Sequence, residues 1–167
     1  MWGFSLENGR VVLDGRPLSD IAAEVGVTPF YLYSKRLIQE RVEALRAHLP
    51  DSLKLHYAVK ANPLPEVIQY VSGLVDGLDV ASGGELEMAY RQAPKAVISF
   101  AGPGKSDDEL AQSLERGACI NLESLGEARR LAAIRRRRET DRDGRRCDSV
   151  RRRPRSATHP AESEFRR

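Results

Sequence analysis

The stretch "LHYAVKANP", residues Leu55–Pro63, alternates apolar and polar side chains and then stops at an Asn-Pro pair. In a β-strand, alternate side chains point to opposite faces. One face would carry Leu55, Tyr57 and Val59, and the other would carry His56, Ala58 and Lys60. A lysine therefore closes the more polar face at the last position of the strand. It either lies at the wet edge of a sheet or has a chemical role, and the rest of the sequence bears on that choice.

A unit of strand, short loop and helix repeats from this stretch onward. The strand-like segments are "LHYAVK", "DGLDVAS", "AVISFAGPG" and "ACINLES". After the first, Pro65 marks the first position of a helix. Each of the other three runs into an S-x-x-E capping box, at Ser82–Glu85, Ser106–Glu109 and Ser124–Glu127. A period of about 20 residues is typical of parallel βα units, so the sequence predicts an α/β fold with a parallel sheet.

Such units form either a doubly wound sheet or a (β/α)8 barrel. Polar residues on the strand faces opposite the helix-packing residues, such as His56, Lys60 and Asp79, favour a barrel whose interior becomes wet towards its top. Active-site residues of such barrels lie at the carboxyl ends of the strands, so we expect Lys60, Asp79, Ser82 and the segment 102–105 to meet on one rim. A lysine held there could form a covalent bond with an aldehyde.

The residues before this unit are predicted to form a small separate part. Residues 4–27 contain short strands with hairpin turns at Asn8-Gly9 and Asp14-Gly15, followed by the helical stretch "LSDIAAEVG". "PFYLYS" is predicted to be a further strand. Ser34 is then expected to open a helix that Pro50 stops, with one apolar face made of Ile38, Val42, Leu45 and Leu49.

The composition changes abruptly after Ile134. Up to that residue the chain has 14 Lys and Arg against 18 acids, whereas residues 135–167 have 13 Arg, no Lys and 6 acids. The latter segment has few apolar residues and no period, so we expect it to be disordered. It has two interpretations. A GC-rich gene read out of frame would give such Lys-free, Arg-rich sequence, and a functional basic tail would bind nucleic acid or an anionic membrane.

Several classes of protein do not fit the sequence. The two cysteines, Cys119 in a strand expected to be buried and Cys147 in the basic tail, indicate no disulfide framework. The tail lacks interleaved aromatic residues, heptads and zinc-ligand spacing, and we expect no metal site. The start "MWGFSLENGR" has no apolar signal region, and no long apolar run occurs. We expect a cytoplasmic protein with neither a membrane nor a nucleic acid as partner.

Three motifs together resemble a known family. "HYAVKANP", "GLDVASGGEL" and "SFAGPGKSDDEL" are similar to the amino-terminal half of the barrel in pyridoxal-phosphate-dependent decarboxylases of the ornithine, diaminopimelate and arginine type, which share the alanine racemase fold. The residues of these motifs are most similar to those of diaminopimelate decarboxylases and of the decarboxylases associated with exosortase gene clusters. The resemblance runs from about Phe4 to Ile134. It implies a partial (β/α)8 barrel of about four units in residues 28–134, and it implies that residues 1–27 are strands of the family's second, β-rich domain plus a linker.

The resemblance also implies roles for single residues. Lys60 matches the lysine that holds pyridoxal 5'-phosphate covalently and later moves protons. Ala58 matches the small residue that lets the cofactor ring lie close, Asp79 a carboxylate near the lysine, and Glu85 an acid near the ring. The two acids also have purely structural interpretations, because Asp79 could satisfy backbone groups at a strand end and Glu85 could be only a capping-box acid.

Further polar residues have simpler expected roles. We expect His56 to be a packed and hydrogen-bonded histidine, Lys105 to be a solvated loop charge and Cys119 to be core. Gly83-Gly84 is a weak signal for phosphate binding. The family's later cofactor-binding segments have no match after Ile134.

We therefore expect the amino-terminal portion of a pyridoxal-phosphate-dependent amino-acid decarboxylase, inactive by itself. The resemblance implies a small amino-acid substrate and, for the full-length family, a homodimer with shared active sites. Two alternatives stay open. One is a racemase or a protein of pyridoxal phosphate homeostasis on the same fold. The other is a non-enzymatic fragment whose basic tail binds anions.

Overall fold

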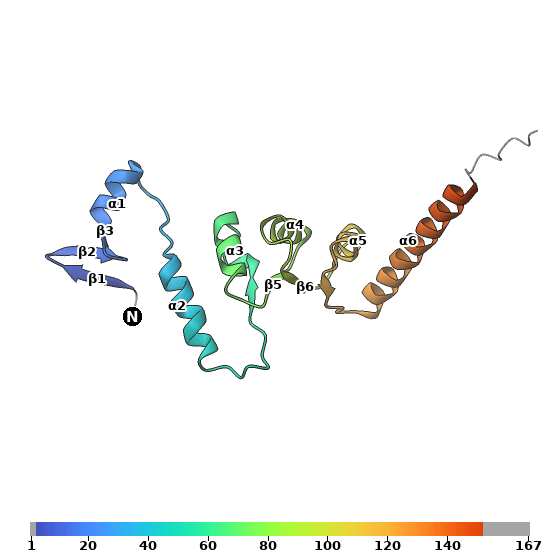
Figure 1. Cartoon of the computed structure of the whole chain (residues 1–167), viewed down its shortest axis with the longest axis horizontal. Coiled ribbons are helices and arrows are strands. Elements are labelled where there is room, and N and C mark those ends of the chain that lie inside the picture. Colours follow the sequence, from blue (N-terminus) through green and yellow to red (C-terminus); the bar gives the residue numbers. More distant parts are fainter. Residues whose placement is uncertain (1–2, 152–167) are drawn as a thin grey trace, which may run out of the picture.

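The computed structural model describes the backbone of residues 3–151 and the side chains of residues 3–139. Its elements follow one another along the long axis of the molecule, from a small antiparallel sheet through a row of helices packed on strands to one long helix (Figure 1). The described strands form two sheets, one with the order β1-β2-β3 and the other with the order β4-β5-β6-β7.

The amino-terminal part is a three-stranded antiparallel sheet followed by a short helix. Its elements are β1 (Phe4–Glu7), β2 (Arg10–Leu13), β3 (Arg16–Pro17) and α1 (Leu18–Val25). Both predicted turns are confirmed, because Asn8, Gly9, Asp14 and Gly15 all have positive φ, as the tight turns of two-residue hairpins require. Val12, Leu13 and Ile21 are its buried apolar residues.

The helix predicted after Ser34 is α2 (Lys35–Arg46), and the Ser34 hydroxyl caps it by accepting a hydrogen bond from the Leu37 N–H. The strand predicted for "PFYLYS" is wrong, because residues 30–34 form neither a strand nor a helix. Tyr31 is 89% exposed, and no described strand lies beside this segment to supply the hydrogen bonds that a strand needs. β-propensity alone does not make a strand without a partner.

The parallel sheet contains β4 (His56–Ala58), β5 (Gly77–Val80), β6 (Val97–Phe100) and β7 (Cys119–Ile120). These strands are joined by α3 (Pro65–Ser72), α4 (Gly83–Gln92) and α5 (Asp107–Arg116). Every neighbouring pair of strands is parallel. The predicted βα units are therefore confirmed, and helices α3 to α5 lie on one side of the strands (Figure 1).

One face of this sheet forms the main core. Leu78, Val80, Ile98 and Phe100 are buried there, together with Ile68 of α3 and Leu86 and Ala89 of α4. Because successive strand residues alternate between faces, the residues between these core positions point to the opposite face of the sheet, away from the helices. Packing of the helices thus decides which strand residues are left for the open face.

The helix starts follow the three S-x-x-E motifs, but only one motif forms a complete capping box. In α5 the Ser106 hydroxyl accepts from the Glu109 N–H, and Glu109 accepts from the Ser106 N–H. In the other two motifs the serine still caps the helix, whereas the glutamate accepts from the residue before the serine. Glu85 accepts in this way from the Ala81 N–H at 2.8 Å.

The last helix extends past the expected end of order. α6 (Leu125–Arg151) continues through Ile134, so the disorder predicted for residues 135–167 does not begin at Arg135. Arginine has a high helix propensity, and Arg135 forms an i,i+4 ion pair with Glu139 while Arg138 pairs with Glu115 of α5. Residues 152–167 of the predicted tail lie outside the described residues.

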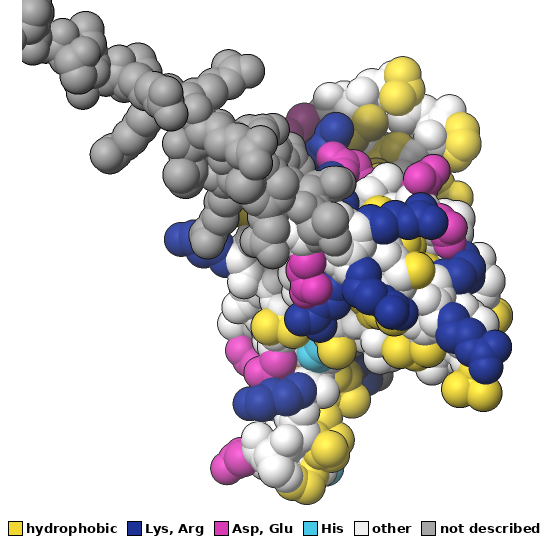
Figure 2. Space-filling model, turned by 90° about the vertical axis from the view of Figure 1, so that its right-hand side faces the viewer, with side chains coloured by type: hydrophobic (Ala, Val, Ile, Leu, Met, Phe, Trp, Pro, Cys, Tyr) yellow, Lys and Arg dark blue, Asp and Glu magenta, His cyan; other side chains and the backbone are white. Residues whose placement is uncertain are grey.

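The described basic side chains do not gather into one patch on the face turned to the viewer in Figure 2. Figure 2 shows blue basic side chains spread over this face with magenta acidic side chains between them. No helix in the described part of the chain is long and apolar enough to cross a membrane.

The position of Gly77 in the sheet yields a test of the parallel pairing. A Cβ at Gly77 would lie 2.7 Å from the carbonyl oxygen of Val97 and 2.7 Å from the His56 ring. We therefore expect Gly77→Ala to lower the free energy of unfolding by about 1–3 kcal/mol.

The matched control is Gly84→Ala in α4, where the nearest atom to a Cβ is the Ser82 hydroxyl at 4.0 Å. Since alanine favours a helix over glycine, this variant should be neutral or gain about 0.5–1 kcal/mol. Urea unfolding followed by circular dichroism compares the two. Equal stabilities of the two variants would contradict the close approach of β4, β5 and β6.

Candidate functional site

The candidate site lies at the carboxyl ends of the parallel strands, on the face that the helices leave open. Lys60 does not end the strand as predicted, because β4 stops at Ala58 and a single 3-10 turn, η1 (Val59–Ala61), follows. The turn buries Val59 completely in the core and leaves Lys60 exposed. Lys60 thus lies just beyond the strand end.

The ladder aligns one residue of each strand on the open face. Ala58 pairs with Asp79, Asp79 with Ser99, and Ser99 with Cys119. In a parallel ladder, paired residues point to the same face, so these four residues form one row across the sheet. We name Ala58, Asp79, Ser99 and Cys119 the open-face row.

The sequence did not predict the positions of two members of this row, Ser99 and Cys119. Ser99 was not singled out from the sequence, and only the parallel register places it beside Asp79. Cys119 was expected in the core, but it is exposed. The reason is that it lies on the open face of β7, the last strand in the described sheet, where neither a helix nor another strand covers it.

The described residues leave two charged side chains near this row without partners. Within residues 3–139, the Lys60 ammonium and the Asp79 carboxylate make no hydrogen bond or ion pair. The Glu85 carboxylate, by contrast, accepts from the Ala81 N–H, as a residue that holds the end of β5 would do. Of the predicted carboxylates, Asp79 is therefore the one available to a ligand.

Lys105 differs most from its prediction as a solvated loop charge. It is 3% exposed, and its ammonium donates to the carbonyl oxygens of Gly102 at 2.7 Å and Asn121 at 2.8 Å. It also forms a buried ion pair with Glu127, at 3.3 Å from Oε1. No short pattern signals this burial, because the partner is a glutamate 22 residues later in the chain and the other two S-x-x-E motifs have glutamates that are not buried.

The hydrogen bonds around Glu127 keep it charged. The Glu123 N–H donates to its carboxylate, and together with the Lys105 ammonium this holds the pKa of the Glu127 carboxyl below its usual range. Likewise the Ser106 and Gly83 N–H groups hold the pKa of the Glu109 carboxyl below its usual range. These carboxylates organise the loops, and they are not free to act as acids or bases.

The two lysines at the rim thus have different chemistry. Lys105 has acceptors on all sides and cannot attack a carbonyl without breaking them, whereas Lys60 is exposed and unpaired within residues 3–139. A free amine, a small Ala58 side chain and an unpaired Asp79 carboxylate fit an aldehyde cofactor with a planar ring. His56 lies half-buried in β4 with its ring close to Gly77, so it is packed as expected, but within residues 3–139 its ring makes none of the hydrogen bonds that were also expected.

A large groove among the described residues lies elsewhere. It has a volume of about 740 Å³ and is lined mainly by apolar side chains of α2, among them Leu37, Val42 and Leu45, together with Tyr57 of β4. Its lining includes no lysine, and it does not include Asp79. This groove is therefore separate from Lys60 and Asp79.

Comparison with known proteins adds independent information. Residues 35–143 match the family model described as "Pyridoxal-dependent decarboxylase, pyridoxal binding domain". Diaminopimelate decarboxylase of Aquifex aeolicus is 38% identical over 122 residues, which are 72% of this chain and 29% of that protein. A Staphylococcus aureus decarboxylase of a substituted 2-hydroxybutanedioate is 34% identical over 105 residues, 62% of this chain and 26% of that protein.

A solved structure agrees with the described fold. The crystal structure of diaminopimelate decarboxylase from M. jannaschii in complex with L-lysine superposes with a TM-score of 0.69 at 27% sequence identity, over 80% of this chain and 32% of that one. The chain thus spans about a third of the length of the relatives it matches. Because the family model covers well over half of its residues, the chain belongs to the family of pyridoxal-dependent decarboxylases, in the part that forms their pyridoxal-binding domain.

Proposed function

We propose that this chain is the amino-terminal portion of a pyridoxal-phosphate-dependent amino-acid decarboxylase of the diaminopimelate decarboxylase type, and that Lys60 holds the cofactor. The family match carries the proposal, since it spans all four strands of the parallel sheet. The unpaired amine just beyond β4 supports the choice of lysine.

Four residues of this chain would have separate roles in holding the cofactor. When bound, pyridoxal phosphate supplies a ring that accepts the electron pair left as carbon dioxide departs. Lys60 would hold the cofactor through Nζ and exchange protons at that atom. The small Ala58 side chain would leave room for the cofactor beside Lys60. The Asp79 carboxylate, opposite Ala58 in the ladder, would balance the positive charge of the Lys60 nitrogen. Glu85 would act indirectly, by fixing the Ala81 N–H.

The choice of decarboxylation over the alternative activities rests on the relatives. The family model and the relatives named above are decarboxylases, which favours this reaction over a racemase or a protein of cofactor homeostasis. Diaminopimelate is the proposed substrate because several diaminopimelate decarboxylases are 35–39% identical to the chain. A homodimer and a cytoplasmic location stay predictions, as does the finer resemblance to exosortase-associated enzymes.

Covalent trapping tests the role of Lys60. The chain has five lysines, Lys35, Lys54, Lys60, Lys95 and Lys105. We expect low concentrations of pyridoxal phosphate followed by borohydride to modify Lys60 before the other four, because it lies just beyond β4, where Ala58 is paired in the ladder with Asp79, whose carboxylate has no partner within residues 3–139. Peptide mass spectrometry after partial labelling gives the order of modification.

The matched variants are Lys60→Ala and Lys54→Ala, both at exposed lysines. The first should abolish the earliest adduct with a circular dichroism spectrum like that of the wild type, and the second should leave the adduct in place. Preferred labelling of another lysine, with Lys60 unmodified, would refute the assignment.

Turnover is a separate prediction. We expect the purified 167-residue chain to bind pyridoxal phosphate weakly and to release no carbon dioxide from diaminopimelate, ornithine or arginine. The described sheet is open at β4 and β7, so the cofactor would be held from one side only. Release of labelled carbon dioxide above that of a Lys60→Ala control would show that these residues suffice for catalysis, contrary to our proposal.

A further inference from the structure

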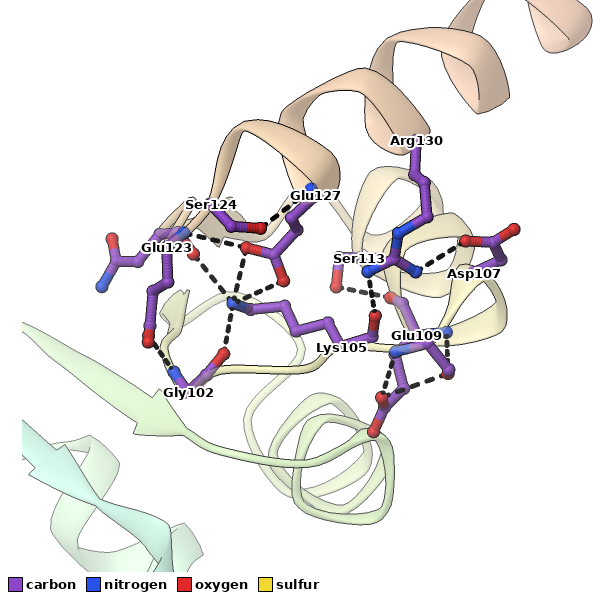
Figure 3. A network of polar contacts seen from close by, with 11 residues as sticks. Gly102, Lys105, Asp107, Glu109, Ser113, Glu123, Ser124, Glu127 and Arg130 are labelled. Atoms are coloured by element: carbon purple, nitrogen blue, oxygen red, sulfur yellow. Dashed lines mark hydrogen bonds and ion pairs between the residues drawn. The ribbon is translucent and has the colours of Figure 1, made fainter.

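The buried ammonium of Lys105 joins two loops at the carboxyl edge of the sheet. Gly102 follows β6 and Asn121 follows β7, and the carbonyl oxygens of both accept from Lys105 Nζ. Figure 3 shows the side chain running beneath α6, with its nitrogen between Gly102 and Glu127. One cation therefore cross-links two consecutive βα units.

A second charged side chain, Glu123, binds the other backbone group of Gly102. The Glu123 carboxylate accepts from the Gly102 N–H at 2.6 Å, while Lys105 binds the Gly102 carbonyl. Gly102 has a φ of 112°, a conformation that residues with a side chain rarely adopt. The N–H and the carbonyl oxygen of this glycine are thus both held by charged side chains. We name Lys105, Glu123 and Glu127 the rim latch.

The rim latch is firmly anchored to α6. The Arg130 guanidinium donates to the Lys105 carbonyl oxygen at 2.7 Å and pairs with Asp107 in the first turn of α5. Inside the protein, a buried charge pair with all its hydrogen bonds made is rigid, because any movement leaves a charge unsatisfied. The loops after β6 and β7 are therefore held as one unit.

This unit reaches the strand that carries Asp79. A Cβ built on Gly102 would lie 3.6 Å from the Ala81 carbonyl oxygen, so Gly102 packs against the chain just after β5. The Ala101 N–H also donates to the Val80 carbonyl. Glu109, in the first turn of α5, also accepts a hydrogen bond from the N–H of Gly83, the first residue of α4, at 2.7 Å. The end of β5 is consequently fixed from the unit that Lys105 orders.

We propose that Lys105 is a positioning residue of the cofactor site, because the rim latch sets the carboxyl ends of β5 and β6, and with them the open-face row beside Lys60. The inference rests on the proposed function. Lys105 itself touches no ligand, since acceptors of this chain surround its ammonium. Its effect is to organise the rim in advance, so that binding does not have to order the loops.

A double variant separates positioning from stability. Lys105→Met alone leaves Glu127 buried without its partner and should destabilise the fold. Lys105→Met with Glu127→Met removes both charges, so its thermal midpoint should return towards that of the wild type, but the cross-link between Gly102 and Asn121 stays broken. We expect this variant to need about tenfold more pyridoxal phosphate for half-maximal trapping at Lys60.

Two further variants keep the test decisive. Lys105→Arg retains a cation and should recover part of the trapping. Glu123→Ala changes an exposed side chain and removes only the contact with the Gly102 N–H, so it should fold even if the double variant does not, and should raise the half-maximal concentration several-fold.

The readout is the concentration dependence of Lys60 modification in the full 167-residue chain, measured where circular dichroism shows each variant folded. If the wild type modifies Lys60 first and both the double variant and Glu123→Ala match its concentration dependence, the rim latch is only structural and this inference is wrong. If the wild type does not modify Lys60 preferentially, the proposed function fails and the inference fails with it.

Discussion

The parallel ladder from β4 to β7 is the constraint on which the rest of the structure depends. Its alternation puts Leu78, Val80, Ile98 and Phe100 under the helices, where burial of each such side chain contributes about 1.5–3 kcal/mol. A slip of one residue would expose this set and bury Asp79. The apolar core therefore also fixes the open-face row, and the position of the candidate site is a consequence of packing on the opposite side of the sheet.

Burial distinguishes the two lysines at this rim. An ammonium in the interior is tolerated only with a counter-charge and hydrogen-bond acceptors, and Lys105 has Glu127 and two carbonyl oxygens. These contacts make it part of the scaffold. Lys60 lies in the 3-10 turn that buries Val59, and its own side chain stays exposed and without a partner within residues 3–139. The fold thus separates a buried, paired lysine from a lysine that is exposed and unpaired within residues 3–139.

The sequence predicted what local signals specify. Capping serines and Pro65 located the helices, the Asn-Gly and Asp-Gly pairs located the turns, and the repeated units indicated the parallel sheet. Misses arose where tertiary contacts decide. "PFYLYS" has strand-forming residues but no pairing partner, and the exposure of Cys119 follows from its place at the edge of the sheet.

The candidate site was predictable in part for the same reason. Lys60 and Asp79 follow from strand ends and from the family's motifs, whereas the pairing of Ser99 with Asp79 depends on a register that no short pattern reveals. The burial of Lys105 depends on a glutamate 22 residues later in the chain. Helix beyond Ile134 follows from the propensity of arginine and its ion pairs, which a search for apolar periodicity does not detect.

The central claim is that the cofactor binds at the carboxyl ends of β4 and β5. Titration of the isotope-labelled chain with pyridoxal phosphate, followed by backbone amide chemical shifts, tests it most directly. Our account predicts the largest changes in residues 58–62 and 79–84, and predicts that they persist in salt. The largest changes at Arg135–Arg138, lost as salt is added, would show instead that the arginines of α6 attract the phosphate, and would contradict the account.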